Sequence, residues 1–362
     1  MEYGSTPSVQ IDLNVVDQNI REAVETMAKY HITHRPHIKV HKSVWLANRQ
    51  QELGCHGITC AKLGEAEVMA DGGIDDILLA YPLIGRDKLE RYRSLVERGI
   101  KVCTIINSLP GARGLSDLGE AMGRRLPVLI ELDGGINRGG LKLGDPLIEF
   151  GKAIRSFKGI RVEGVEYYGG DIYGLKKSED IRARAKKERD EIIDGAKELE
   201  KLGYDMKVLS GGSSFSIRFP EELEGLTEVR AGNYIFNDNA LFSIGMVPVE
   251  RCAMRVYSTV VARPDDCTAI IDAGTKTLTS DRVNFREGFG YIPEEPDAVI
   301  FKCNEEHGFV HCNRKLSWEV GDRISVIPNH ACVVPNLCDE IYGFRSGRME
   351  RVISIEARGR NR

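Results

Sequence analysis

The sequence has no apolar run that approaches the ~18 residues of a membrane-spanning helix. Its first residues, MEYGSTPSVQIDL, show no charged stretch followed by an apolar one, so we expect no secretory signal. A basic excess is also absent. The 50 Lys and Arg residues face 54 Asp and Glu residues, with a pI of about 6.1, so charge does not support a nucleic-acid partner or a membrane surface.

No CxxC pair occurs among the nine cysteines, which lie in apolar segments such as KVCTII and GITCAKL. An odd number of cysteines without a secretory signal is typical of reduced thiols, so we expect a cytoplasmic protein. The 362 residues, of which 42% are hydrophobic and 29% charged, are sufficient for one large domain and a smaller one.

No GxGxxG motif follows an early strand, which disfavours a doubly wound open sheet for dinucleotide binding. Short apolar runs alternate instead with amphipathic helical stretches. Eight runs are predicted as strands, at 37–41, 57–61, 76–81, 101–106, 127–133, 164–170, 207–212 and 228–234. Eight strands, each followed by a crossover, predict a (β/α)8 barrel.

Helical periodicity is nearly absent after about residue 245, where strand-like runs alternate with turn residues. This pattern predicts a C-terminal all-β domain, to which the N-terminal segment PSVQIDL adds a strand. We therefore expect a barrel over 11–243 and a β-domain formed by 1–10 and 244–362.

The segment RPHIKVHK places Lys39 between His37 and His41. If this segment is a strand, all three side chains share one face. Charged neighbours and partial burial would both make the lysine harder to protonate and expose a nucleophilic amine. A basic patch for phosphate or nucleic acid is the alternative that this octapeptide leaves open.

Glycines and serines gather where barrel enzymes commonly bind phosphate, after the seventh and eighth strands. LSGGSSFS (209–216) offers backbone N–H groups and hydroxyls, while RAGNYIF offers Gly232 and the Tyr234 hydroxyl. Each glycine run alone is also typical of a tight turn. An amine and a phosphate cup at one barrel mouth are what pyridoxal phosphate (PLP) requires.

Two further side chains follow predicted strands. Arg138, in DGGINRGG, is a candidate contact of the PLP ring or its phenolic oxygen, and otherwise a surface arginine. Tyr168, in YYGGD, is a candidate to pack on the ring, and otherwise fills the barrel mouth.

His330 and Cys332, in IPNHACVV, share a face if this segment is a strand, and imidazole plus thiolate suits Zn²⁺. Two ligands are fewer than a structural zinc needs, although water and substrate can complete a catalytic site. A core cysteine beside an unrelated histidine is the alternative. His307, in NEEHGF, is a weaker candidate ligand or acid–base group, or a turn histidine.

The motifs RPHIKVHK, LSGGSS, EVRAGNYIF, IIDAGTK, EEHG, VGDRISVIPNHAC and EARGR occur in an order that resembles D-threonine aldolase and eukaryotic-type D-serine dehydratase. These are alanine-racemase-like, fold-type III PLP enzymes. The resemblance covers essentially the whole chain. It implies that Lys39 forms the Schiff base, that His330 and Cys332 hold a divalent metal (Zn or Mn), and that the protein is a homodimer. The implied phosphate-binding residues are Ser210, Gly211, Gly212, Ser213, Gly232 and Tyr234.

One family feature is lacking: a histidine that commonly follows the sixth strand and assists proton transfer. This chain reads YYGGDIYG there, so Asp171 or Tyr173 is the candidate substitute. The His-x-Cys spacing of His330 and Cys332 resembles the dehydratase branch more than the aldolases with His-x-Asp.

We therefore expect a metal-assisted, PLP-dependent lyase for D-configured β-hydroxy amino acids, with aldol cleavage and dehydration both open. The metal would bind the substrate β-hydroxyl as a Lewis acid. An amino-acid racemase would need Lys39 and the phosphate cup but no metal. A non-catalytic PLP-binding protein and a cofactor-free metal hydrolase are further alternatives.

Overall fold

The computed structural model describes residues 4–362 as two compact units. The barrel unit comprises Glu22–Lys39, Ala47–Gly232 and Arg360–Arg362. The β-unit comprises the residues up to Arg21, Val40–Leu46 and Asn233–Gly359. Residues 1–3 of the N-terminal segment assigned to the β-domain lie outside the described residues. Within the described chain, no helix combines the length and apolar character needed to cross a bilayer.

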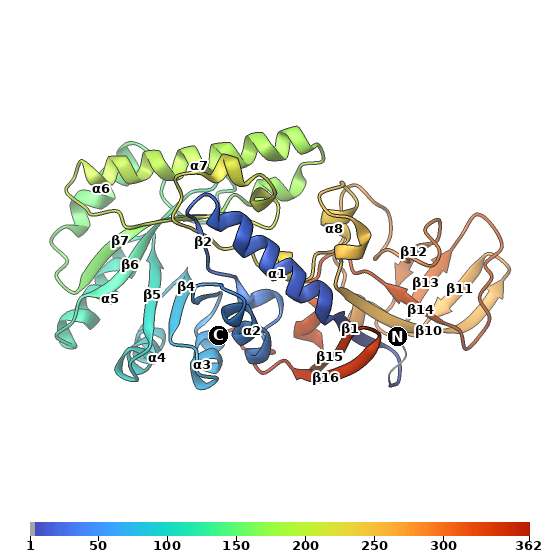
Figure 1. Cartoon of the computed structure of the whole chain (residues 1–362). Helices are drawn as coiled ribbons and strands as arrows, with labels where there is room; N and C mark the ends of the chain where they lie inside the picture. The colour runs from blue at the N-terminus through green and yellow to red at the C-terminus, as the bar shows by residue number, and fades with distance from the viewer. Residues whose placement is uncertain (1–3) are drawn as a thin grey trace. The chain divides into compact units, whose positions relative to one another are not determined.

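Eight parallel strands form the barrel in the spatial order β2-β9-β8-β7-β6-β5-β4-β3 (Figure 1). The ring closes between β2 and β3 through a bridge between His37 and Thr59. The strands are β2 (Thr33–His34), β3 (Ile58–Cys60), β4 (Asp76–Pro82), β5 (Lys101–Ile106), β6 (Leu126–Leu132), β7 (Ile160–Tyr167), β8 (Val208–Gly211) and β9 (Glu228–Val229). The predicted (β/α)8 barrel is confirmed.

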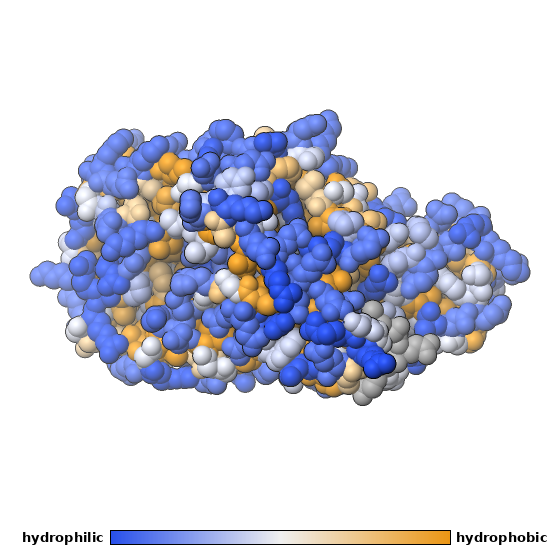
Figure 2. Space-filling view, in the orientation of Figure 1, coloured by the Kyte–Doolittle hydropathy of each residue, from blue (hydrophilic) through white to orange (hydrophobic). Residues whose placement is uncertain are grey.

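Helices connect most barrel strands and lie outside the sheet (Figure 1). They are α2 (Val44–Glu52), α3 (Leu63–Asp71), α4 (Arg86–Glu97), α5 (Leu109–Ala121), α6 (Asp145–Ile154) and α7 (Ser178–Glu200). The start of α5 is fixed by Ser108, whose side chain accepts the Gly111 N–H. The outer faces are rich in charged residues, and hydrophilic side chains dominate the face shown in Figure 2.

One further long helix, α1, and several short helical segments complete the chain. The α-helices are α1 (Leu13–Ala28), α8 (Asn239–Phe242) and α9 (Thr275–Leu278). The 3-10 turns are η1 (Ile38–Val40), η2 (Gly170–Gly174), η3 (Ser216–Arg218), η4 (Pro220–Leu223), η5 (Asn233–Ile235), η6 (Val249–Arg251) and η7 (Val334–Leu337). Between β8 and β9 the crossover contains η3 and η4 in place of an α-helix.

Three predicted strands are wrong in position or extent. The strand expected at 164–170 is β7, which begins four residues earlier and ends at Tyr167. No strand spans 37–41, because β2 ends at His34 and 38–40 form the turn η1. Pro36 lacks an N–H for a ladder, and the chain turns after it. The strand expected at 228–234 ends at Val229. The three polar side chains of RPHIKVHK therefore do not alternate along a strand.

Apolar side chains fill part of the barrel interior and hold its strands in register. Leu78, Ile105 and Leu129 form a buried cluster, with Cys103 and Val208 packed against it. These residues come from neighbouring strands, so the cluster fixes the strand ends that carry the polar residues of the mouth.

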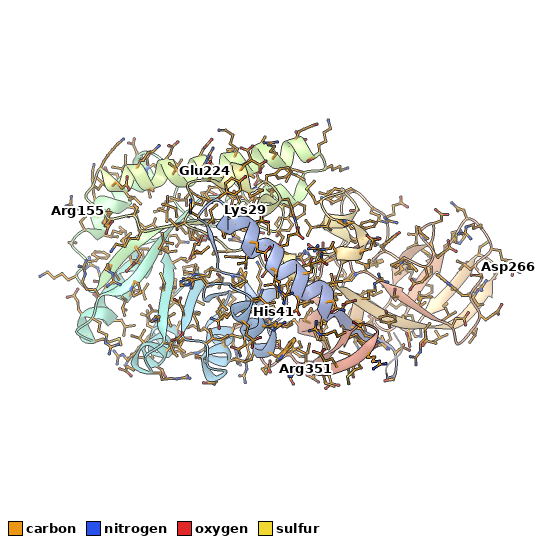
Figure 3. All side chains as sticks on the ribbon, in the orientation of Figure 1. Lys29, His41, Arg155, Glu224, Asp266 and Arg351 are labelled. Carbon is orange, nitrogen blue, oxygen red and sulfur yellow. The ribbon has the colours of Figure 1, made fainter. Side chains whose placement is uncertain are left out.

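The β-unit contains an eight-stranded sheet in the order β12-β13-β11-β10-β1-β15-β16, with β14 paired to β10. Its strands are β1 (Ser8–Asp12), β10 (Met254–Asp265), β11 (Thr268–Ile271), β12 (Val299–Cys303), β13 (Gly308–His311), β14 (Arg323–Val326), β15 (Glu340–Arg345) and β16 (Arg348–Ser354). β1 pairs antiparallel with β10 and parallel with β15, so the predicted N-terminal strand is confirmed. Asp266 marks the tight turn between β10 and β11 in Figure 3.

Candidate active site

Lys39 lies in the turn η1, which follows the first barrel strand. The side chain is half-buried, and its Nζ is 5.7 Å from the centroid of the Tyr168 ring. Lys39 is therefore at the C-terminal end of the strand, as predicted, but on a turn.

His37 is a neutral neighbour rather than a second positive charge. Burial lowers the pKa of His37 well below its usual value, and the charges of Lys39 and Arg230 lower it further. Among the residues that the structure describes, none is a hydrogen-bond partner of its buried Nδ1. The structure therefore gives no support for a charged imidazole at His37 beside Lys39, because burial first, and the neighbouring cations second, favour the neutral ring.

Arg138 and Tyr168 meet at the barrel mouth. The Arg138 guanidinium carbon is 4.5 Å from the centroid of the Tyr168 ring, and Nη2 is 3.9 Å from Oε1 of Glu131. Burial and the charge of Glu166 raise the pKa of Glu131. The structure therefore brings the Lys39 amine and the Arg138 guanidinium together at the ring of Tyr168.

The loop after β8 is more tightly bonded than the sequence suggests. Ser210 Oγ donates to Oε1 of Glu228 at 2.6 Å and accepts from Arg230 Nη1 at 2.5 Å, so this hydroxyl is already engaged. Gly212 has a φ of +78° and donates its N–H to Glu188. Ser213 is buried and donates its N–H to Ser216 Oγ at 2.7 Å.

Gly232 brings the end of the last barrel strand against the turn that carries Lys39. A Cβ at Gly232 would lie 2.6 Å from the His37 carbonyl oxygen, which is a steric clash, so only glycine fits at this position. The His37 N–H also donates to the Ala231 carbonyl at 3.3 Å. The lysine and one part of the predicted phosphate cup are thus joined within the barrel unit. Tyr234 is buried in η5 and belongs to the β-unit.

A charged network below the mouth was not predicted. Arg230 is buried and bonds through Nη2 to the Glu166 carboxylate and, at 2.9 Å, to the Tyr167 carbonyl. The sequence did offer a signal for this network. Glu166 in GVEYYGG and Arg230 in EVRAGNY are charged residues in predicted barrel strands, whose interior side chains are usually apolar.

His330 and Cys332 follow β14 in a turn, so the prediction that they share a strand face is wrong. The chain turns there after Pro328, which donates no backbone N–H. Although burial lowers the pKa of His330, Cys332 and Asp238 together raise it well above its usual value, partly through side-chain hydrogen bonds. The two candidate ligands are therefore adjacent.

Asp238 holds the imidazole of His330 and was missed by the sequence analysis. Its Oδ2 lies 3.0 Å from His330 Nδ1 and also accepts the Ala331 N–H at 3.0 Å and Asn233 Nδ2 at 2.6 Å. Asp238 is fully buried. A carboxylate on Nδ1 fixes the ring and leaves Nε2 as the nitrogen available to a ligand.

No group of three or more His, Cys, Asp or Glu side chains within residues 4–362 is arranged to hold a metal ion. His330 and Cys332 lie in the β-unit, whereas Lys39, Arg138 and Tyr168 lie in the barrel unit. His307 is exposed in the turn between β12 and β13, where its carbonyl accepts the Asn304 N–H at 2.9 Å.

The two candidate substitutes for the absent histidine have different surroundings. The Asp171 carboxylate accepts two bonds from Arg184 Nε, at 2.7 and 2.9 Å. The Tyr173 ring packs edge-on against Phe215, with centroids 4.8 Å apart, and lies 6.5 Å from the ring of Tyr168.

Two family models match the chain. One, described as "Alanine racemase, N-terminal domain", matches residues 11–240. The other, described as "Putative serine dehydratase domain", matches residues 253–344.

Characterised relatives match over nearly the full length. D-threo-3-hydroxyaspartate dehydratase from Delftia sp. (strain HT23) is 32% identical over 346 residues, which cover 90% of each protein. The crystal structure of D-threonine aldolase from Filomicrobium marinum is 28% identical, covers 99% of this chain and 97% of that chain, and has a TM-score of 0.90. A cysteine-to-alanine mutant of D-threo-3-hydroxyaspartate dehydratase in the metal-free form is 29% identical, covers 97% of each chain and has a TM-score of 0.90.

Proposed function

This chain belongs to the D-threonine aldolase and D-serine dehydratase family of alanine-racemase-like enzymes, and we propose that it is a PLP-dependent, metal-assisted lyase for D-3-hydroxy amino acids. The family relationship supports PLP chemistry and a lyase activity. The metal-free form in the name of a solved structure of the dehydratase supports a metal requirement in that relative.

The barrel mouth fits PLP by its own chemistry. Lys39 supplies the amine for the cofactor aldehyde, and Gly232 leaves room where a side chain would meet the backbone of His37. The buried Nδ1 of His37, which has no hydrogen-bond partner within residues 4–362, is a further polar atom in the same place. Bound there, PLP would supply an electron sink for the substrate Cα.

We assign cofactor binding to the predicted set, with two refinements. Ser210 supports Glu228 and Arg230, and the N–H groups of Gly212 and Ser213 are donated within the loop and to Glu188. The other members are candidate direct contacts. The full proposed set is Lys39, Arg138, Tyr168, Ser210, Gly211, Gly212, Ser213, Gly232 and Tyr234. Arg138 and Lys39 both contact the face of Tyr168, so this ring orients the two cations of the mouth.

The pair of His330 and Cys332 fits a divalent metal, with Zn or Mn as the proposed ion. Nitrogen and sulfur ligands suit Zn²⁺, and Asp238 leaves Nε2 of His330 for the metal. Such an ion would act as a Lewis acid toward the substrate β-hydroxyl, and two protein ligands leave positions for water and substrate.

Lys39 Nζ is the proposed proton acceptor of the mouth, because it is the amine next to Tyr168. For the second acid–base group we favour Tyr173 over Asp171. The Asp171 carboxylate neutralises Arg184, whereas Tyr173 lies beside Tyr168.

We also keep the domain division as a proposal: a PLP-binding barrel over 11–243 and a β-domain of 1–10 and 244–362 that carries the metal site. A homodimer in the cytoplasm, with a small D-amino acid as its partner, completes the proposal. Nothing in the charge of the chain supports a nucleic-acid role.

The single observation that carries the lyase proposal is the His330–Cys332 pair with its buried Asp238. A racemase has no need of a Lewis acid at the β-hydroxyl, so this pair favours lyase over racemase. It equally argues against a non-catalytic PLP-binding protein.

Product analysis tests the proposal. D-threonine, D-serine and D-3-hydroxyaspartate are each incubated with the holoenzyme, with and without Zn²⁺ or Mn²⁺. Glycine plus an aldehyde indicates aldol cleavage, whereas a keto acid plus ammonia indicates dehydration. Racemisation of D-alanine that is faster than any of these reactions would overturn the lyase assignment.

A further inference from the structure

Glu188, on α7, contacts the loop that follows β8. Its Oε1 accepts the Gly212 N–H at 2.8 Å, and its carboxylate also takes a side-chain hydrogen bond from Ser216. Ser216 Oγ in turn accepts the Ser213 N–H at 2.7 Å. One carboxyl group therefore joins both ends of the segment 212–216.

A carboxyl group is costly in this position. Glu188 is only 2% exposed, and burial raises its pKa. The Gly212 N–H, the charges of Arg184 and Arg230, and the Ser216 hydroxyl all act in the opposite direction. Packing alone would be served better by an apolar side chain on this inner face of α7.

The loop is also confined sterically. A Cβ at Gly212 would lie 2.6 Å from Cγ1 of Val229 on β9, and a Cβ at Gly211 would lie 2.6 Å from Cδ1 of Ile192 on α7. The loop thus lies between a strand and a helix. The hydrogen bond of Glu188 selects one conformation in that narrow space, with Gly212 at a φ of +78°.

We propose that Glu188 is a positioning residue for the phosphate of the cofactor: it holds the loop 211–216 in its binding conformation before the phosphate arrives. A loop ordered in advance pays less conformational entropy on binding, so affinity for the phosphate rises without a direct contact from Glu188. The inference rests on the proposed function, because it takes the phosphate to be that of PLP.

The test compares PLP with pyridoxal, which lacks the phosphate, as ligands of the apoprotein. Glu188→Ala should weaken PLP binding about tenfold, the effect of losing roughly one well-formed hydrogen bond, and change pyridoxal binding less than twofold. Glu188→Gln should recover most of the PLP affinity, because its amide oxygen still accepts the Gly212 N–H.

Glu198 provides a matched control on the same helix. Its Oε2 accepts the Gly144 N–H at 2.9 Å, so it performs the same local task for a different loop. Glu198→Ala should leave the ratio of the two affinities unchanged. If Glu188→Ala fails to fold, Glu188→Asp, whose shorter side chain does not reach Gly212, takes its place in the comparison with Glu188→Gln.

Equal weakening of PLP and pyridoxal in the Glu188 variants would overturn the inference and leave a purely structural role. A selective loss of PLP affinity in Glu198→Ala, with pyridoxal binding unchanged, would overturn it too. Failure of the wild-type protein to prefer PLP over pyridoxal would instead remove the proposed function, and this inference with it.

Discussion

The barrel mouth and the His330–Cys332 pair differ in how many of the groups needed for binding the protein itself supplies. The mouth combines an amine and a guanidinium over one aromatic ring with a loop fixed by hydrogen bonds. The pair offers two donors and one orienting carboxylate, and no group of three or more candidate ligands occurs in the described part of the chain. We therefore expect the mouth to retain PLP more firmly than the His330–Cys332 pair retains a metal ion.

The largest effect is expected when the mouth loses its amine. Lys39→Ala should lower kcat at least about 10³-fold, because both cofactor attachment and proton transfer depend on this group. Borohydride treatment followed by peptide mapping should find the pyridoxyl group on Lys39 in the wild type and none in the variant. Lys101→Ala, at the exposed start of β5, is the control and should behave as the wild type.

A reducible cofactor–protein bond that persists in the Lys39→Ala protein would contradict this assignment. It would mean that another lysine is the attachment point and that the mouth is not the cofactor site.

Removal of the metal should abolish the function of the His330–Cys332 pair and leave cofactor binding at the barrel mouth unchanged. Chelation, or Cys332→Ala, should reduce turnover of D-3-hydroxy amino acids about 10²-fold or more while the absorbance of bound cofactor stays unchanged. Added Zn²⁺ or Mn²⁺ should restore the chelated wild type but not the variant.

Cys338 is the matched control for Cys332. It is also half-buried, and burial raises the pKa of Cys338 to about 12, which keeps it a thiol. Cys338→Ala should therefore retain metal-dependent activity. Full activity of metal-free enzyme would refute the role given to the pair.

A smaller effect is expected at Asp238. Asp238→Asn should weaken metal binding about 10–100-fold, because the neutral amide no longer fixes His330 as the carboxylate does. Activity should recover at high metal concentration, which separates an orienting role from a ligand. A metal titration with the cofactor spectrum as the measure of folding decides the point. Asp272→Asn, at a carboxylate bonded to Ser258 in the same unit, is the control.

The smallest effect concerns stability at the barrel mouth. The raised pKa of Glu131 means that the folded protein binds a proton there more tightly than the unfolded chain. Its contribution to stability is therefore fullest below about pH 4.3, the value of a free glutamate, and is lost as the pH rises through the raised pKa.

Glu131→Gln should remove the loss of folding stability that ionisation of the buried Glu131 carboxyl causes as the pH rises. The melting temperature of the variant should gain about 1–4 °C on the wild type between pH 4.5 and neutral pH. Glu149→Gln, at an exposed residue of α6, should show no such gain. Parallel melting curves of wild type and Glu131→Gln would show that the buried carboxyl is not a cost to folding.

The fold was predictable because its strands are short apolar runs with regular spacing. β5 matches the predicted range 101–106, and β4 and β8 differ from theirs by one or two residues. The strand ends near the site were not predictable. The turn at 38–40 depends on the approach of Gly232 to His37, a contact between segments almost 200 residues apart.

The position of a candidate residue was predictable where it follows a strand within a motif, as for Lys39 and Arg138. Residues that act through other residues were missed. Asp238 stands in an irregular segment without periodicity. Glu188 is one of many charged residues in α7, but its helical spacing from the buried Ala185 and Ile192 was a usable signal.

Seven of the eight borders of the barrel are ladders. The eighth, between β2 and β3, is the bridge of His37 and Thr59, with backbone hydrogen bonds from the Thr59 N–H to the Pro36 carbonyl and from the His56 N–H to the His34 carbonyl. Local opening begins where the fewest backbone bonds must break, so amide protons at this border should exchange with deuterium before those of β6. Lys39 is two residues from the bridge. The Lys39 amine thus lies beside one of the shortest borders of the ring, where local opening would give it freedom of movement while the longer ladders stay closed.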